Sequence, residues 1–271
     1  MRSIIKTILI KLKLLDTKST SSSEKINFPG GIVPINETKS EDVFIVGFPK
    51  SGNTLMQHII THLVYGINEE GSRSMVNLIV PDIYANSHYF RLNTVCYFKS
   101  HERPQPAYKK VIYLIRDGRE ALLSYYHMLK NMGKAISLEE LYNGKINIYG
   151  GLWHEHIEAW EKNPYESTIL WVKYEDLKND KYNQLKRICE FLDIKRTPQD
   201  LEKVVELTSL EHMKTLENRS DWQLINKSYF IENKKFLRKG SVDSFKKNIP
   251  AELIKEFTSQ NLSILKKYYS K

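Results

Sequence analysis

Short apolar runs alternate with longer amphipathic segments along most of the chain. Residues 43–48, 94–99, 110–115 and 168–173 consist largely of apolar and aromatic side chains. Runs of this length without polar alternation are typical of strands that are buried on both faces of a sheet. The pattern therefore predicts four buried strands.

Between these runs, apolar residues recur at three- and four-residue spacing. Leu55, Ile59 and Leu63 form one such stripe, which ends at Gly66. This spacing places side chains on one face of a helix, and glycine is common just after a helix end. The same pattern predicts helices over residues 51–66, 118–133, 150–163, 181–194, 198–214 and 250–269.

Because strands alternate with helices, the strands are expected to pair in parallel. We predict an α/β fold of three layers, in which helices flank a central parallel β-sheet. In such sheets ligands bind outside the carboxyl ends of the strands. Lys50, Lys99, His101, Arg116 and Tyr174 lie at or just beyond these ends, so they are candidate site residues.

The N-terminal part of the chain differs from the rest. Residues 1–15 mix Ile and Leu with Lys and Arg, and a Ser-rich stretch follows at 19–25. We interpret residues 1–40 as a basic amphipathic segment with a linker, and residues 41–271 as one domain. The segment either lies on a membrane surface or is a frayed or docked helix. No small-residue cleavage site follows it, which disfavours a secretory signal.

Composition narrows the classes of protein further. The chain of 271 residues carries a formal charge of +9, which favours anionic partners without choosing among nucleotides, nucleic acids, acidic substrates and membranes. It has only two cysteines, Cys96 and Cys189, so we expect no disulfide framework and favour a reducing, cytoplasmic compartment. Apolar runs are too short for a spanning helix.

The turn after the first predicted strand reads GFPKSGNT, residues 47–54. A strand, a glycine-bracketed turn and a helix are the context of a phosphate-binding loop, in which backbone N–H groups and the helix dipole attract an anion. Asn53 occupies the place of the usual lysine, and Lys50 lies three residues earlier. No strand-end aspartate suited to magnesium follows. We therefore expect an anion-binding loop without metal chemistry.

A second candidate anion site follows the strand at 110–115. Arg116 offers a planar guanidinium suited to phosphate, and Ser124 lies about two turns into the next helix. By themselves these residues are equally compatible with a surface ion pair and an unrelated serine.

His101 is the candidate general base, and it follows Lys99 in the segment FKSH. A neutral histidine accepts protons near neutral pH, and a neighbouring lysine stabilises negative charge on oxygens being transferred. His58 and His62 have the i, i+4 spacing of a zinc helix, but Ile59 replaces the glutamate of that motif. We expect no metal site.

Together these clusters resemble the PAPS-dependent sulfotransferases, which transfer a sulfuryl group from 3′-phosphoadenosine-5′-phosphosulfate (PAPS) to a hydroxyl or amine. GFPKSGNT is similar to the 5′-phosphosulfate loop of that family, RDGREALLS to its 3′-phosphate motif, and FKSH to the segment with its catalytic base. VKYEDL and FLRKGS also match, and the motifs keep the family's order between residues 43 and 248.

The resemblance implies a P-loop NTPase-like sulfotransferase fold, PAPS as donor, 3′-phosphoadenosine-5′-phosphate (PAP) as product, and no metal. It implies that His101 deprotonates the acceptor, that Lys50 contacts the leaving phosphate, and that Lys99 supports the sulfuryl oxygens. The other residues implied to bind the donor are Ser51, Gly52, Asn53, Thr54, Arg116, Ser124, Tyr174, Thr208, Arg238, Lys239 and Gly240. Leu55 and Leu210 depart from the family pattern, because aromatic residues usually stand there, so the packing around adenine is expected to differ.

A sulfotransferase acting on a small-molecule, sugar or lipid-like acceptor is the leading hypothesis. The alternatives are a small-molecule P-loop kinase, against which the displaced lysine argues, and a non-catalytic anion-binding module. We expect a small-molecule or carbohydrate acceptor, no nucleic acid, a cytoplasmic or membrane-peripheral location and, as an open alternative, a homodimer. The acceptor pocket is expected from the loops at 67–93 and 219–237.

Overall fold

The computed structural model describes residues 31–67, 72–91, 93–218, 222, 230–231, 234–237 and 243–269. Every element described below belongs to the compact unit formed by residues 32–271. The predicted amphipathic segment at residues 1–15 lies outside the described residues. In the described part of the chain, no helix combines the length and the apolarity that crossing a membrane requires.

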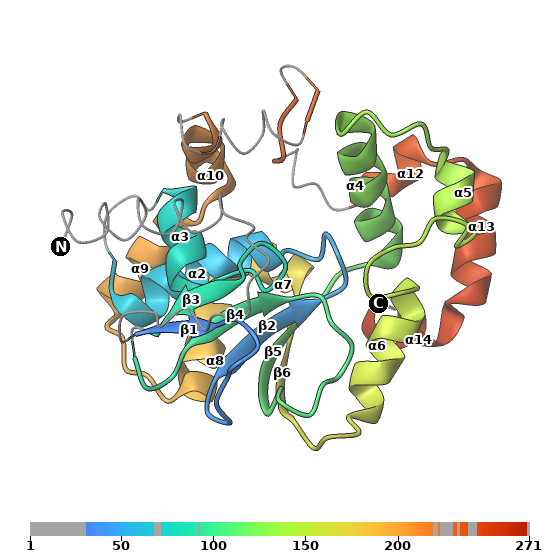
Figure 1. Cartoon of the computed structure of the whole chain (residues 1–271). Helices are drawn as coiled ribbons and strands as arrows, with labels where there is room; N and C mark the ends of the chain where they lie inside the picture. Colours follow the sequence, from blue (N-terminus) through green and yellow to red (C-terminus); the bar gives the residue numbers. More distant parts are fainter. Residues whose placement is uncertain are drawn as a thin grey trace, which may run out of the picture. The chain divides into compact units, whose positions relative to one another are not determined.

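Four parallel strands form the central sheet (Figure 1). They are β2 (Val43–Gly47), β4 (Tyr97–Ser100), β5 (Lys110–Ile115) and β6 (Thr168–Lys173), in the order β4-β2-β5-β6. This order places β2 between β4 and β5, so the residues that follow these three strands meet at one edge of the sheet. The four predicted strands and their parallel pairing are confirmed.

Alternate side chains of β2 pack against helices on opposite faces of the sheet. Val43 and Ile45 belong to one buried cluster, and Phe44 and Val46 belong to the other. The first face is covered by α2 (Asn53–Tyr65), α7 (Tyr174–Asn179), α8 (Lys181–Leu192) and α9 (Pro198–Leu207). The second face is covered by α4 (Gly118–Asn131), α5 (Leu138–Tyr142), α6 (Trp153–Lys162), α12 (Phe245–Asn248), α13 (Ala251–Gln260) and α14 (Leu262–Tyr269). The predicted three-layer α/β fold is therefore confirmed.

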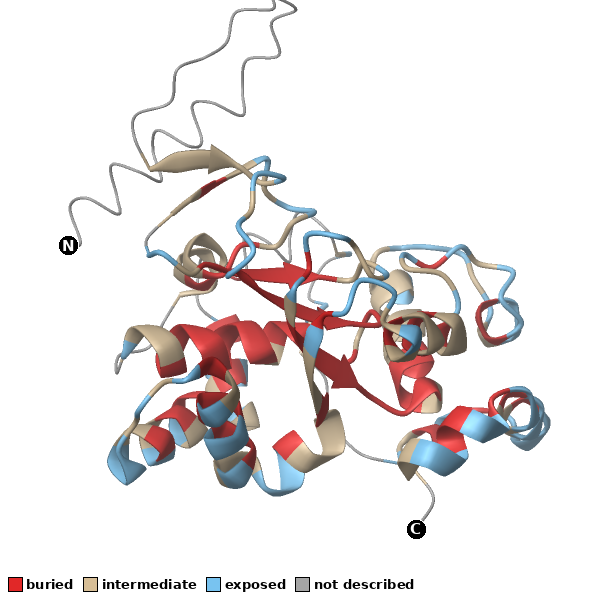
Figure 2. Cartoon of the chain, turned by 90° about the horizontal axis from the view of Figure 1, so that it is seen from below, coloured by how far each residue is buried: buried red, intermediate tan, exposed pale blue. Residues whose placement is uncertain are grey.

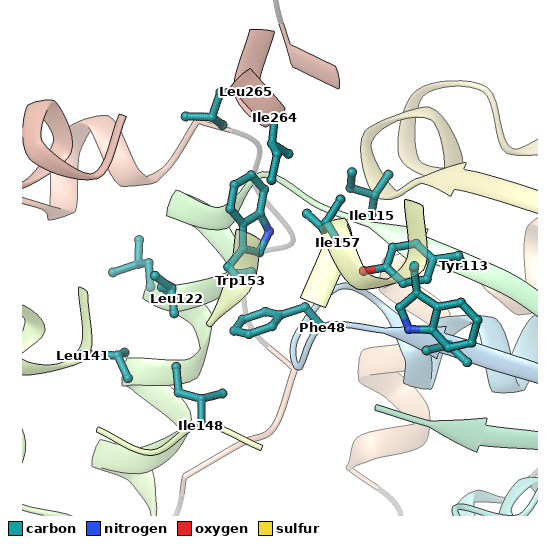
Figure 3. Close-up of a cluster of buried hydrophobic side chains, with 14 of the residues drawn as sticks. Phe48, Tyr113, Ile115, Leu122, Leu141, Ile148, Trp153, Ile157, Ile264 and Leu265 are labelled. Atoms are coloured by element: carbon teal, nitrogen blue, oxygen red, sulfur yellow. The ribbon is translucent and has the colours of Figure 1, made fainter. Parts of the chain in front are cut away.

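Burial follows these layers. In Figure 2 the strands β2, β4 and β5 and the inward faces of the helices are mostly buried, whereas exposed residues lie on outer helix faces and loops. Large aromatic side chains fill the second face, among them Phe48, Tyr113 and Trp153 (Figure 3). The Trp153 indole N–H donates to the Arg116 carbonyl at 3.0 Å, so this packing also holds the residue that follows β5.

Some elements differ from the prediction. The helix expected over 198–214 is two helices, α9 and α10 (Leu210–Glu217), because the Ser209 hydroxyl caps the second one by accepting from the His212 N–H. The helix expected over 250–269 divides at Asn261. The segment 67–93, expected as a loop, contains α3 (Arg73–Ile79) and β3 (His88–Phe90), and β3 pairs antiparallel with β1 (Ile32–Pro34).

Gly118 begins α4 where that helix meets the rings of Trp153 and Phe257. A Cβ at this position would lie 2.5 Å from Trp153 Cδ2 and 2.7 Å from Phe257 Cζ. We expect Gly118→Ala to lower the free energy of unfolding by about 1–3 kcal/mol, because an overpacked core must shift. Urea denaturation measures the change. Lys130→Ala, at an exposed position of the same helix, is the control and should change stability little; equal losses would contradict the packing argument.

His58 is fully buried in α2, and neither ring nitrogen has a hydrogen-bond partner among the described residues. Its ring stacks on Trp222 with centroids 5.7 Å apart. Burial, with a smaller contribution from Arg73, lowers the pKa of His58 well below its ordinary value. The unfolded chain therefore binds a proton below about pH 6.5 that the folded protein excludes.

Stability should consequently fall as the pH falls below about 6.5, and His58→Phe should reduce this loss while keeping a stacked ring. We expect the free energy of unfolding of the variant to drop by about 1 kcal/mol less than that of the wild type between pH 7 and pH 5.5. Urea denaturation at the two pH values measures it, with His154→Phe at a half-exposed position as control. Identical pH dependence in His58→Phe and wild type would refute the role of His58.

Candidate active site

The turn after β2 has the backbone shape expected of an anion-binding loop. Lys50 and Gly52 have positive φ angles of 71° and 109°, and α2 begins at Asn53. A Cβ on Gly52 would lie 2.8 Å from the Tyr174 ring, so only glycine permits this approach. The N-terminus of α2, with its unpaired N–H groups and positive dipole end, therefore lies beside Tyr174.

Buried polar atoms around this loop lack protein partners. Ser51 Oγ, Asn53 Oδ1 and Arg116 Nε are buried, and none has a hydrogen-bond partner among the described residues. Such groups are nearly always bonded in proteins, and the serine hydroxyl and the arginine N–H are donors, which fits an anionic ligand. The amide Nδ2 of Asn53 donates to the Ser100 carbonyl at 3.0 Å and ties the loop to β4.

Arg116 connects the loop to two further elements. Its Nη1 donates to the Lys50 carbonyl at 3.0 Å, and its guanidinium carbon lies 4.3 Å from the centre of the Tyr174 ring. Its Nη2 lies 3.5 Å from Glu120 Oε2. Glu120 also accepts from the Ser244 hydroxyl and from the Phe245 N–H, both at 2.9 Å. The second candidate anion site is therefore continuous with the loop at 47–54.

The His101 ring is held by the end of β2. Its Nδ1 lies 2.7 Å from the Gly47 carbonyl oxygen. Because a carbonyl only accepts, Nδ1 carries the proton and Nε2 keeps a lone pair. Burial, reinforced by the charge of Lys99, lowers the pKa of His101 to about 3, so the ring is neutral near pH 7.

The backbone of His101 is anchored from both sides. Its N–H donates to the Tyr84 hydroxyl at 3.0 Å, and the two rings lie nearly parallel with centroids 6.0 Å apart. Its carbonyl accepts from His156 Nε2 at 3.0 Å, while Tyr113 donates to His156 Nδ1 at 2.7 Å. Burial lowers the pKa of His156 to about 4, which keeps this chain of hydrogen bonds neutral.

A cavity of about 300 Å³ opens at the carboxyl ends of the strands. Its walls bring together most of the predicted site residues, namely Lys50, Gly52, Asn53, Thr54, Lys99, His101, Arg116, Ser124 and Tyr174. Leu55 and Leu210, the two departures from the family pattern, line it as well. Segments far apart in the sequence thus form one site.

Other predicted residues lie elsewhere. Ser51 belongs to the loop but is buried and does not line the cavity. Thr208 is 1% exposed, and its hydroxyl donates to the Val204 carbonyl at 2.6 Å instead of facing the cavity. Arg238, Lys239 and Gly240 lie outside the described residues.

The site also contains residues that the sequence analysis missed. Glu120 and Met128 line the cavity from α4, at four-residue spacing on either side of Ser124, so the helical period would have identified them. Lys50 Nζ lies 3.8 Å from Met128 Sδ and 3.8 Å from the centre of the Phe236 ring. No helical period could have identified Phe236, because it lies 108 residues after Met128 in the sequence and outside α4.

The loops expected to form the acceptor pocket contribute unequally. Tyr84 lies beside His101, and Tyr149, whose ring contacts Tyr84 at 4.3 Å between centroids, lines the cavity. In contrast, Tyr89 and Trp222 are buried and do not line it. No group of three or more His, Cys, Asp or Glu side chains suited to a metal ion occurs among the described residues.

Two solved structures that resemble this chain are complexes with PAP. One is retinol dehydratase in complex with androsterone and inactive cofactor PAP, with a TM-score of 0.70, 17% identity and coverage of 87% of this chain and 83% of that chain. The other is mouse sulfotransferase SULT7A1 complexed with PAP, with a TM-score of 0.62, 20% identity and coverage of 86% and 90%. At these identities the likeness shows the fold.

Sequence relatives point the same way. Flavonol 3-sulfotransferase of Flaveria bidentis is 26% identical over 246 residues, covering 79% of this chain and 78% of that protein. Sulfotransferase 2A6 of Mus musculus is 29% identical over 226 residues, covering 77% and 78%. A family model described as the sulfotransferase domain matches residues 40–268, and the chain therefore belongs to the sulfotransferase family, as its motifs predicted.

Proposed function

We propose that the protein transfers a sulfuryl group from PAPS to a hydroxyl or amine of a small-molecule acceptor, with His101 as the general base. The observation that carries this proposal is the orientation of His101 in the cavity. The bond from Nδ1 to the Gly47 carbonyl leaves the lone pair of Nε2 to accept the acceptor proton. The anion-binding loop follows β2 at the same carboxyl end of the parallel pair β2–β4.

The low pKa of His101 is compatible with this role. In the free protein, burial and the Lys99 ammonium hold the imidazole neutral. PAPS would supply the sulfuryl group and several negative charges. Anionic charge near an imidazole raises its pKa, so His101 is expected to become a better base when the donor is bound. Lys50 and Lys99 would stabilise negative charge on the oxygens around the transferred group.

The remaining contacts of the donor follow from the cavity walls. The N–H groups of Gly52, Asn53 and Thr54, together with the Ser51 and Thr54 hydroxyls, would hold the 5′-phosphate at the start of α2. Arg116 and Ser124 would hold the 3′-phosphate, with Arg238, Lys239 and Gly240 added from the following loop. Tyr174, Leu55 and Leu210 would surround the adenine, whereas the bonded hydroxyl of Thr208 suits a supporting role.

The setting of the enzyme is a further part of the proposal. The only two cysteines of the sequence, Cys96 and Cys189, are both buried and are not bonded to each other, which supports a reducing cytoplasmic compartment. We retain residues 41–271 as the catalytic domain and residues 1–40 as a basic segment with a linker. Contact of residues 1–15 with a membrane surface, and a homodimer, stay predictions.

Donor binding gives the first test. We expect PAP at about a hundred times its dissociation constant to stabilise the protein by about 2.7 kcal/mol and to raise Tm by roughly 5–10 °C. Lys50→Met should weaken this shift, because it removes a charge from the anion loop. Differential scanning fluorimetry measures the shift, with adenosine as a control that lacks phosphates. A wild-type Tm unchanged by millimolar PAP would refute the proposed donor.

The pH dependence tests the general base. The pKa of His101 lies near 3 in the free protein, and kcat/KM for PAPS reports the free protein. We therefore expect this ratio to stay constant through pH 6.5, the ordinary pKa of histidine, and down to about pH 5. His101→Gln should reduce kcat by about 10²–10⁴-fold while the PAP-induced shift of Tm survives. A transfer assay with radiolabelled PAPS measures kcat and kcat/KM, and differential scanning fluorimetry measures the shift of Tm. Unchanged kcat in His101→Gln would exclude His101 as the base.

A further inference from the structure

Asp82 is a partly buried carboxylate beside Lys99 that no motif of the sequence identifies. Its Oδ2 lies 2.6 Å from Lys99 Nζ, and the two side chains are only 14% and 11% exposed. Its Oδ1 accepts from the Tyr84 N–H at 3.1 Å. One carboxylate oxygen is therefore held by the backbone, and the other is directed to the lysine.

The backbone of this segment is paired with the end of β4. The Lys99 N–H donates to the Pro81 carbonyl at 2.9 Å, and the Ile83 N–H donates to the Lys99 carbonyl at 3.1 Å. The Asp82 N–H donates to the Asn77 side chain at 3.2 Å. These bonds fix where the carboxylate stands relative to Lys99, independently of the ion pair itself.

The charges around Lys99 make this carboxylate important. Arg73 from α3 is partly buried and Lys99 is buried, and the charge of Asp82 raises the pKa of both. Burial lowers the pKa of Lys99 and Arg73 lowers it further, whereas Asp82 raises it. His101, which follows β4, is neutral. A buried ammonium that loses its counter-ion tends to release its proton.

We propose that Asp82 is a positioning residue for sulfuryl transfer, which holds Lys99 at the cavity wall as a charged ammonium next to His101. This inference rests on the proposed function, since Lys99 would act on the transferring group. The same segment also supplies the Tyr84 hydroxyl that accepts from the His101 N–H. Residues 82–84 thus set the charge of the lysine and the place of the base together.

The test is the pH dependence of Asp82→Asn between pH 6 and pH 9. In the wild type, burial lowers the pKa of Lys99 while the ion pair with Asp82 raises it, so kcat should lose less toward pH 9 than in Asp82→Asn. In Asp82→Asn, kcat at pH 8 should fall at least about tenfold, and the loss should grow as the pH rises, because the unpaired lysine deprotonates. KM for the acceptor should change by less than about threefold.

Asp42→Asn is the matched control. Asp42 is fully buried and pairs with Arg91 at 2.7 Å, but it lies just before β2, at the end of the strand away from the cavity. Its loss should lower Tm without changing the shape of the pH profile. Asp82→Glu, which restores a carboxylate, should recover the wild-type pH profile. If Asp82→Asn does not fold, the pH profile of Asp82→Glu still tests the proposal.

A double-variant comparison tests whether Asp82 acts through Lys99. Asp82→Asn should cost much less in a Lys99→Met background than in the wild type, because the lysine it supports is already absent. An equal cost in both backgrounds, a wild-type pH profile in Asp82→Asn, or an Asp82→Glu profile that matches that of Asp82→Asn would each overturn the proposal.

A readout that does not depend on turnover separates this inference from the proposed function. Carbon-13 NMR of the lysine Cε groups, assigned with Lys99→Met, follows the Lys99 charge directly. The Lys99 resonance should titrate at a lower pH in Asp82→Asn than in the wild type, because the variant lacks the carboxylate that raises the pKa of Lys99. Titration at the same pH in both would overturn the proposal, whereas a wild type without sulfuryl transfer would refute only the proposed function.

Discussion

The hydrogen bond from His101 Nδ1 to the Gly47 carbonyl is the constraint on which the rest of the site depends. It joins the end of β4 to the end of β2 and determines which ring nitrogen carries the proton. The carbonyl itself is fixed, because Gly47 packs so closely on β5 that a Cβ would lie 2.6 Å from the Leu114 carbonyl oxygen. A second bond, from the Asn53 amide to the Ser100 carbonyl, joins the start of α2 to the end of β4.

Desolvation at this edge of the sheet decides which groups are charged. His156 is buried and His101 is partly buried, neither ring forms a hydrogen bond to a carboxylate among the described residues, and burial lowers the pKa of both, so both are neutral near pH 7. Lys99 is also buried but has Asp82 at 2.6 Å. A neutral imidazole and a lysine paired with a carboxylate therefore lie two residues apart. This division suits a reaction in which a proton is accepted at one point while negative charge is stabilised at a neighbouring one.

The fold was largely predictable from the pattern of apolar residues. The four strands of the sheet are continuous apolar runs, and their alternation with amphipathic segments implies parallel pairing. The short elements α3, α5, β1 and β3 escaped prediction, because three to seven residues are too few to show a helical or strand period. The divisions at Ser209 and Asn261 fall within continuous amphipathic patterns that persist across both breaks.

The anion loop was predictable from one short stretch of sequence, because the strand, the glycine-bracketed turn and the start of α2 are contiguous. Their anion-binding chemistry comes from backbone N–H groups. The same holds for the candidate pairs Lys99 with His101 and Arg116 with Ser124. The partners of these residues were a different matter. In the sequence, Asp82 lies 17 residues from its partner Lys99. The separation is 54 residues between Gly47 and His101, and 66 residues between Lys50 and Arg116. Such pairs are set by which strands lie next to each other, and so the tautomer, the charges and the cavity follow from packing of the sheet.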